Sequence, residues 1–372
     1  MPPRKILYTI PNFDTAGSGK ALFKIAERLD PTAFEPHLCC THDRGDFFRT
    51  VKASGIPIHI VKYTTPMSDR WRGVRECWRI SRFFRQFDLI HSFHYSDDYS
   101  EPLAARMAGV NWIYTKKNMS WGTNAWRLRT RLAHGIVAQN TDMMRLFFAW
   151  NPKATLIPRG VDTTEFAPRP PATHLYDEFA LPPDADVILT VANLVPVKGI
   201  ECLIDAFTAI ADSRPAARLF IVGDDRSEYA AQLKVRAASG PATSRIVFTG
   251  RRSDVRDFQS IARAFVLPTL NEGRQEGSPV SLLEAMACET LVLASDVAGI
   301  RDQLAELPEQ LFEPGDVADL TRKLNWTFGL SCGQLKHRGQ EQGRIVQTRY
   351  TIEREVQVHD TTYRSVLHPD GS

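Results

Sequence analysis

The sequence predicts an α/β protein with two parallel-sheet domains. Short apolar runs alternate with segments of helical periodicity along most of the chain, as buried parallel strands alternate with the helices that cover them. The chain has 372 residues, 43% of them hydrophobic, which is enough for two cores. A proline-rich segment at 169–185 interrupts the periodicity, and we interpret it as a linker between the two domains.

The first predicted domain, residues 1–168, begins with a strand followed by a glycine-containing loop. The other strands expected here are apolar runs at 37–40, 58–61, 88–91, 112–115, 135–138 and 154–158. Ligands of such sheets bind at the carboxyl ends of the strands. Gly17 and Gly19 lie in the first loop, 11–19, ahead of a helix expected from about Lys20, as in a phosphate-approach loop or an ordinary turn. A P-loop is excluded, because its first glycine is missing and Ala21 follows the lysine.

A basic helix is predicted over residues 68–87. Its apolar side carries Ile80, Phe83, Phe84 and Phe87, and the other side carries basic and aromatic residues: Trp71, Arg72, Arg75, Trp78, Arg79, Arg82 and Arg85. A second basic stretch with tryptophans follows at 116–131, and residues 1–170 hold 25 Lys and Arg against 15 Asp and Glu. Such a face suits an anionic membrane surface, and the alternative is a solvated basic face. Neither stretch matches a nucleic-acid-binding module, so no nucleic-acid partner is expected.

The second predicted domain, 186–340, contains the element around which the chain is organised. Strands are expected at 187–192, 218–223, 246–250, 264–267 and 291–294. Between the last two lie a polar loop, 269–277, and a helix over 280–287, with Ser278 as its predicted N-cap and Pro279 at the first helical position. Glu276 precedes this helix and Glu284 lies inside it.

Two carboxylates and a helix N-terminus therefore converge on one place. Unpaired N–H groups and the helix dipole favour a phosphate there, and carboxylates accept hydrogen bonds from sugar hydroxyls. The alternative for Glu276 is a surface acid that stabilises the dipole. Glu284 has apolar neighbours in the sequence and therefore needs a partner. The combination suits a nucleotide sugar.

The stretch EGSPVSLLEAMA, with seven residues between its two glutamates, resembles the signature helix of retaining GT-B glycosyltransferases of the family-4 class (glycosyl transferases group 1). The resemblance implies two Rossmann-like domains that face each other across a cleft, the first on the acceptor side and the second binding the nucleotide sugar. It also implies that Glu276 contacts the donor sugar and Glu284 the ribose. Residues 341–372 are expected to be helical and to pack back on the first domain.

Other segments extend the resemblance and depart from it in places. Lys198 and Gly199 resemble the family's Lys-Gly pair, whose lysine holds the donor diphosphate, but Asn193 stands where an arginine is expected. Arg251 or Arg274 is a candidate for the missing charge, and Gly17 matches one glycine of the family's Gly-Gly pair. Backbone N–H groups of Gly277 and Ser278 complete the expected donor site.

The acceptor side is expected to involve His94 and Lys117, which follow two neighbouring strands. Lys117 stands where the family has a histidine. The resemblance implies no metal and no cofactor other than the nucleotide sugar itself.

The predicted function is transfer of a sugar from a nucleotide-diphosphate sugar to a glycan or lipid-linked acceptor, with retention of configuration (hexosyltransferase-type), in polysaccharide or glycoconjugate synthesis. The alternatives are a non-catalytic GT-B protein that binds sugar nucleotides or carbohydrate and, with less support, a nicotinamide-dependent Rossmann enzyme. The sequence has no membrane-span-length apolar run, no secretory signal pattern and six scattered cysteines without metal-ligand spacing. A cytoplasmic protein, peripheral at the inner face of a membrane, is therefore expected.

Overall fold

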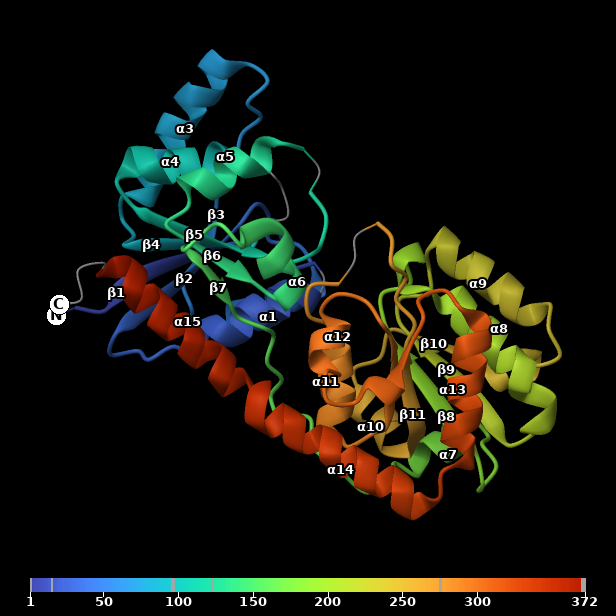
Figure 1. Ribbon diagram of the computed structural model, residues 1–372. Coiled ribbons are helices and arrows are strands. Elements are labelled where there is room, and N and C mark those ends of the chain that lie inside the picture. The colour runs from blue at the N-terminus through green and yellow to red at the C-terminus, as the bar shows by residue number, and fades with distance from the viewer. Residues whose placement is uncertain (1, 15, 95–97, 122, 274–275, 369–372) are drawn as a thin grey trace. The chain divides into compact units, whose positions relative to one another are not determined.

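The computed structural model describes residues 2–14, 16–94, 98–121, 123–273 and 276–368 (Figure 1). The chain forms two compact units. The first unit runs to Arg159 and resumes at Ile352, and the second unit is Gly160–Thr351. Each unit contains one sheet in which every pair of neighbouring strands is parallel. The predicted α/β class with two parallel sheets is confirmed.

The sheet of the first unit has seven strands in the order β3-β2-β1-β4-β5-β6-β7. The strands are β1 (Arg4–Thr9), β2 (Phe34–Cys40), β3 (Ile58–Ile60), β4 (Leu89–Ser92), β5 (Asn111–Lys116), β6 (Gly135–Ala138) and β7 (Ala154–Leu156). Each contains residues of a predicted apolar run, because strands buried on both faces are apolar throughout. The order reverses beside β1, so β1 and β4 define the switch point where ligands of such sheets bind.

Helices cover both faces of this sheet. The helices are α1 (Ala16–Ala26), α2 (Asp46–Ala53), α3 (Arg70–Phe84), α4 (Ser100–Ala108), α5 (Ala125–Leu132), α6 (Thr141–Met143), followed by a π-helical turn (Met144–Phe148), and α15 (Ile352–Leu367). Core residues of α1, α2 and α15 form one cluster with the sheet, and those of α3 and α4 form another. Helix α1 begins earlier than predicted, so that Gly17 and Gly19 lie in its first turns and not in a loop.

The second unit repeats this plan with six strands in the order β10-β9-β8-β11-β12-β13. The strands are β8 (Asp186–Val191), β9 (Ala217–Val222), β10 (Ile246–Gly250), β11 (Ala262–Leu267), β12 (Val292–Ser295) and β13 (Leu311–Phe312). Successive side chains point to opposite faces, so Val187 and Leu189 join one core cluster and Ile188 the other.

The helices of the second unit divide between these two clusters. They are α7 (His174–Glu178), α8 (Ile200–Ile210), α9 (Glu228–Ala238), α10 (Val255–Ile261), α11 (Val280–Ala287), α12 (Ile300–Gln303), α13 (Val317–Gly329) and α14 (Cys332–Arg349). Residues of α8, α9 and α13 pack on one face, and residues of α7, α10, α11, α12 and α14 pack on the other.

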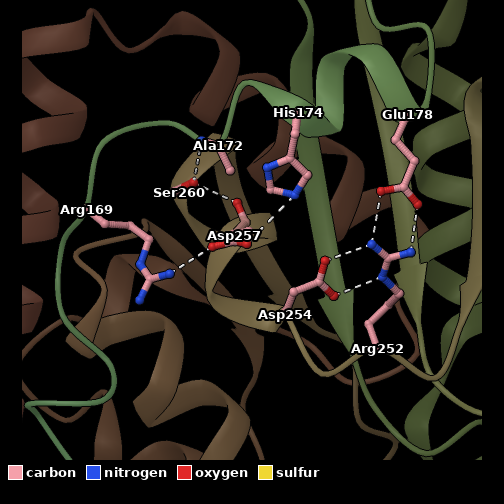
Figure 2. A network of polar contacts seen from close by, with 8 residues as sticks. All are labelled: Arg169, Ala172, His174, Glu178, Arg252, Asp254, Asp257 and Ser260. Atoms are coloured by element: carbon pink, nitrogen blue, oxygen red, sulfur yellow. Dashed lines mark hydrogen bonds and ion pairs between the residues drawn. The ribbon is translucent and has the colours of Figure 1, made fainter.

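The predicted linker, 169–185, is part of the second unit. Its helix α7 buries Leu175 completely in that unit's core. Figure 2 shows the polar contacts that hold the segment: Arg169 pairs with Asp257 at 2.8 Å, and Glu178 pairs with Arg252 at 2.7 Å. The prolines of this segment break the helical and strand periodicity in the sequence. The segment still packs on the core, because side chains of α10 and of the loop before it bind it.

The helical C-terminus is shared between the units. Helix α14 and Thr351 belong to the second unit, and α15 from Ile352 belongs to the first. Thus part of the segment expected to pack on the first domain, residues 341–351, lies with the second unit. At this crossing the Val161 N–H donates to the Tyr350 carbonyl at 2.8 Å, so the outgoing and returning chains are hydrogen-bonded.

Helix α14 lies so close to the turn after α11 that only glycine fits at Gly339. A Cβ there would lie 2.1 Å from the Glu289 carbonyl oxygen. We expect Gly339→Ala to lower the free energy of unfolding of the second unit by about 1–3 kcal/mol or more, as overpacking does. Gly333→Ala is the matched control on the same helix, because its Cβ would meet no atom within 4 Å. Chemical denaturation of both variants tests this, and equal stabilities would contradict it.

Candidate functional site

The helix predicted to begin the site, α11, starts one residue later than expected. Pro279 is its N-cap, with φ −71° and ψ 119°, and no side chain caps it among the described residues. Ser278 is therefore not the N-cap, and its hydroxyl instead accepts a hydrogen bond at 3.0 Å from the Gln303 amide of α12. Because no side chain takes up the N–H groups of the first turn, the helix start can bind an anion.

Lys198 and Glu276 are brought together from two loops. Lys198 ends a 3-10 turn, Pro196–Lys198, that follows β8, and Glu276 lies in the loop between β11 and α11. Strands β8 and β11 are neighbours in the sheet, so both loops leave its carboxyl edge side by side. The Lys198 ammonium donates to a carboxylate oxygen of Glu276, and each side chain is only 18% exposed.

Gly199 fixes the turn that carries Lys198. Its φ of +60° is left-handed, and a Cβ at this position would lie 2.1 Å from the Pro268 carbonyl oxygen. The Leu270 N–H donates to the Val197 carbonyl at 2.8 Å and joins the same two loops. The Lys-Gly pair thus has a physical cause, because any residue larger than glycine would separate the lysine turn from the loop that leads to Glu276.

Burial lowers the pKa of Lys198 to about 8. The adjacent Glu276 carboxylate favours the charged ammonium. Lys198 therefore carries its charge at pH 7 and loses it as the pH rises through about 8. A largely buried ammonium of this kind interacts strongly with a phosphate, because little water screens the charge.

Glu284 lies in the middle of α11 and is half-buried. Leu282, Leu283, Ala285 and Met286 around it are fully buried. Burial and the Glu284 charge together raise the pKa of the Cys288 thiol, one helical turn further on, to about 12. Glu284 is therefore less buried than the neighbours on either side of it in the helix.

The remaining predicted donor residues are more exposed. Gly17 lies in the first turn of α1, where a Cβ would meet no atom within 4 Å, and Asn193 is exposed after β8. Arg251 is exposed and pairs at 3.2 Å with Asp224, which Arg226 also binds. Arg251 and Arg226 thus share one carboxylate. Arg274 lies outside the described residues.

On the acceptor side, His94 and Lys117 lie together at the carboxyl ends of β4 and β5. Both line a small cavity of about 10 Å³, together with Lys116, Asn118, Trp121 and Arg129, among others. Burial and the charges of Arg129 and Lys117 lower the pKa of His94 to about 3. Burial also lowers the pKa of Lys117 well below its ordinary value, and its amine donates to the Phe93 carbonyl.

A buried carboxylate beside this cavity was not predicted from the sequence. Glu101 is fully buried and accepts hydrogen bonds from Thr9 at 2.5 Å and Ser92 at 2.6 Å, with Arg129 at 3.6 Å. Burial raises its pKa, and these partners oppose the shift. Glu101 lies in the first turn of α4, where most acids are solvated, so no local pattern marks it.

One group of side chains has the composition of a metal site. Ligand atoms of His174, Asp254 and Asp257 lie within 4.8 Å of one another. Figure 2 shows that both carboxylates already hold arginines, Asp254 with Arg252 and Asp257 with Arg169. The geometry is that of an ion-pair network that ties α7 to α10.

Helix α3 presents the basic face that the sequence predicted, over a slightly shorter range. It buries Cys77, Ile80 and Phe84, whereas Trp71 is 90% exposed and Trp78 is 52% exposed. The side chains beside these tryptophans include four exposed arginines: Arg72, Arg75, Arg79 and Arg82. Among the described residues, no helix has both the length and the apolar character needed to cross a membrane.

Two family models match the chain, Glycosyltransferase Family 4 over residues 15–165 and Glycosyl transferases group 1 over residues 175–345. The D-inositol 3-phosphate glycosyltransferase of Jonesia denitrificans is 26% identical over 259 residues, which are 61% of this chain and 60% of that protein. The GDP-mannose-dependent monoacylated alpha-(1-6)-phosphatidylinositol monomannoside mannosyltransferase of Corynebacterium glutamicum is 28% identical over 184 residues, 48% of this chain and 47% of that protein. The chain thus spans about half to three-fifths of the length of these two relatives.

Solved structures share the whole fold. Anabaena HepE in complex with UDP-glucose superposes with a TM-score of 0.82 at 18% sequence identity, over 97% of this chain and 100% of that one. At this level of sequence identity, the similarity shows a shared fold, that is, the same arrangement of helices and strands.

Proposed function

Since the chain belongs to the glycosyl transferases group 1 and has the GT-B fold, we propose that it moves a sugar from a nucleotide-diphosphate sugar to a glycan or lipid-linked acceptor. The single observation that carries the proposal is the meeting of Lys198 and Glu276 at the carboxyl edge of the second sheet. A cation for the diphosphate and an acceptor for sugar hydroxyls lie there within contact of each other. The relatives whose names state a sugar transfer support the proposal.

In this proposal each end of the donor has its own group. Lys198 binds the diphosphate, Glu276 the sugar and Glu284 the ribose, and backbone N–H groups of Gly277 and Ser278 add donors without a metal ion. The bond from the anomeric carbon to the diphosphate oxygen breaks, and the acceptor oxygen bonds to the same face of the sugar. The leaving phosphate takes the acceptor proton. Positive charge near the leaving oxygens stabilises the transition state.

The donor is identified by a thermal-shift screen of UDP-, GDP- and ADP-sugars. A ligand that binds only the folded state at 100 times its Kd stabilises it by about 2.7 kcal/mol, so the true donor raises the melting temperature. Transfer of labelled sugar by the wild type, and its loss in Glu276→Ala, supports the proposal. Donor binding without hydrolysis or transfer under any acceptor would instead indicate a non-catalytic binding protein.

We further propose that helix α3 places the first unit on an anionic membrane, at the inner face, where a lipid-linked acceptor is reached. Four exposed arginines and two exposed tryptophans lie on one helix, which is the composition of an interfacial helix. Each basic side chain near an anionic surface contributes about 1 kcal/mol of binding. A relative whose name includes phosphatidylinositol monomannoside supports a lipid acceptor.

Vesicle co-sedimentation tests the membrane proposal. We expect binding to vesicles with phosphatidylserine and none to pure phosphatidylcholine, and we expect added salt to weaken the binding. The double variant Trp71→Ala and Trp78→Ala is expected to bind at least tenfold more weakly. Arg322→Gln on α13, an arginine that is 77% exposed, is the control and should bind like the wild type. Equal binding of the tryptophan variant would contradict the proposal.

A further inference from the structure

The contact between Lys198 and Glu276 conflicts with the roles that the two side chains have in donor binding. The proposed function, on which this inference rests, assigns the Lys198 charge to the donor diphosphate and the Glu276 carboxylate to the donor sugar. In the structure the two groups neutralise each other, because the ammonium donates to the carboxylate. A neutralised lysine attracts a diphosphate less than a free one does.

We propose that Glu276 is an internal competitor of the donor diphosphate, which occupies Lys198 until the diphosphate replaces it. The carboxylate, an anion with two acceptor oxygens, takes the place of a phosphate oxygen at the ammonium. When the diphosphate binds Lys198, the Glu276 side chain is released and becomes available to the sugar hydroxyls. The same exchange in reverse helps to expel the nucleoside diphosphate product.

The geometry favours movement of the glutamate and not of the lysine. The turn that carries Lys198 is fixed by the contact of Gly199 with Pro268 and by the hydrogen bond from Leu270 to Val197. Glu276 lies in the loop between β11 and α11, in which Asn271, Glu272 and Gly273 are exposed. The backbone that carries Lys198 is thus held from two sides, and we assign the exchange to rotation of the Glu276 side chain.

The ion pair between Lys198 and Glu276 is expected to affect either the stability of the protein or its affinity for anions. Both side chains are 18% exposed, so the pair is poorly screened, and removal of either charge changes how the other interacts. If the ion pair is purely structural, removing it changes the stability of the protein and leaves its affinity for anions unchanged. If Glu276 is an internal competitor, removing its charge makes the protein bind the excluded anion more tightly. This difference distinguishes the two roles.

The test measures the Kd of inorganic pyrophosphate and of UDP, GDP and ADP by titration calorimetry. Glu276→Gln keeps the shape of the side chain and removes its charge, and we expect it to bind pyrophosphate about tenfold more tightly than the wild type. Glu272→Gln removes the same charge from an exposed position in the same loop and is expected to change the Kd less than twofold. Equal affinities of the two variants would overturn the inference.

Two further variants keep the outcome interpretable. Glu276→Asp shortens the side chain by one methylene and should give an intermediate gain, which tests the inference even where Glu276→Gln fails to fold. Lys198→Met should lose pyrophosphate binding. If Lys198→Met binds pyrophosphate like the wild type, the proposed donor site is wrong. If it loses binding while Glu276→Gln and Glu276→Asp gain nothing, only the inference fails.

Discussion

Replacing Lys198 with methionine is expected to reduce kcat roughly 10²–10³-fold, which is the usual effect of removing one group that stabilises a developing charge. The loss should be this large because Asn193 cannot supply positive charge and Arg251 is held by Asp224. The donor diphosphate then leaves without the cation that Lys198 offers it. Initial rates with the identified donor, at saturating acceptor, give the measurement.

The control for this prediction is Lys234→Met on α9. Lys234 pairs with Asp225 on the surface, and its loss removes the same charge from the same unit. We expect wild-type rates from it. Because burial lowers the pKa of Lys198 to about 8, wild-type activity should also fall as the pH rises above 8. Activity of Lys198→Met within threefold of the wild type would remove the lysine from the mechanism.

Replacing Glu355 with alanine is expected to cost the first unit about 3–5 kcal/mol, as removal of one partner from a buried ion pair does. Glu355 accepts from Arg159 at 3.0 Å, and both side chains are almost completely buried. His359 cannot replace the lost negative charge, because an imidazole is neutral or cationic, and burial lowers the pKa of His359 to about 3. Arg159 would then be a buried cation without its carboxylate.

Thermal unfolding measures this loss. At about 2–4 °C per kcal/mol for a unit of this size, the melting temperature should fall by roughly 10 °C. Glu353→Ala, an exposed acid on the same helix, should change it by less than 2 °C, since surface substitutions of this kind alter stability little. Replacing both members of the pair, with Arg159→Met and Glu355→Leu, should recover much of the loss. A stable Glu355→Ala variant would show that Arg159 is satisfied by other groups.

Most strands were predictable from the sequence, because strands buried on both faces are apolar runs that stop abruptly. Gly135–Ala138 and Ile246–Gly250 match the expected ranges fully. Element ends and unit boundaries were less predictable. Helix α1 starts at Ala16, with two glycines in its first turns. Glycine is a poor helix former, and the prediction therefore placed both glycines in a loop. The segment 169–185 has the composition of a linker, and it belongs to the second unit through the buried Leu175 and through ion pairs to residues about 75 to 90 positions away.

Part of the candidate site was predictable for a different reason. Glu276 and Lys198 stand in local motifs, and parallel strands bring their carboxyl ends to one edge. Their ion pair was not predicted, because it joins residues 78 positions apart and depends on the closure at Gly199. Ser278 was expected to cap α11, but the Gln303 amide from α12 takes its hydroxyl. The neighbours of Glu101 are likewise set by the tertiary fold alone.

The crossing at Arg159 and Ile352 has a consequence for synthesis on the ribosome. Residues of α15, among them Ile352 and Tyr363, complete the core over one face of the first sheet. The second unit is made entirely between the two parts of the first. At 5–20 residues per second, roughly 10–40 seconds separate translation of β7 from that of Tyr363. The unit whose strands are made first is therefore the last to finish folding, and the part of its apolar face that α15 covers stays exposed while the nascent chain is still growing.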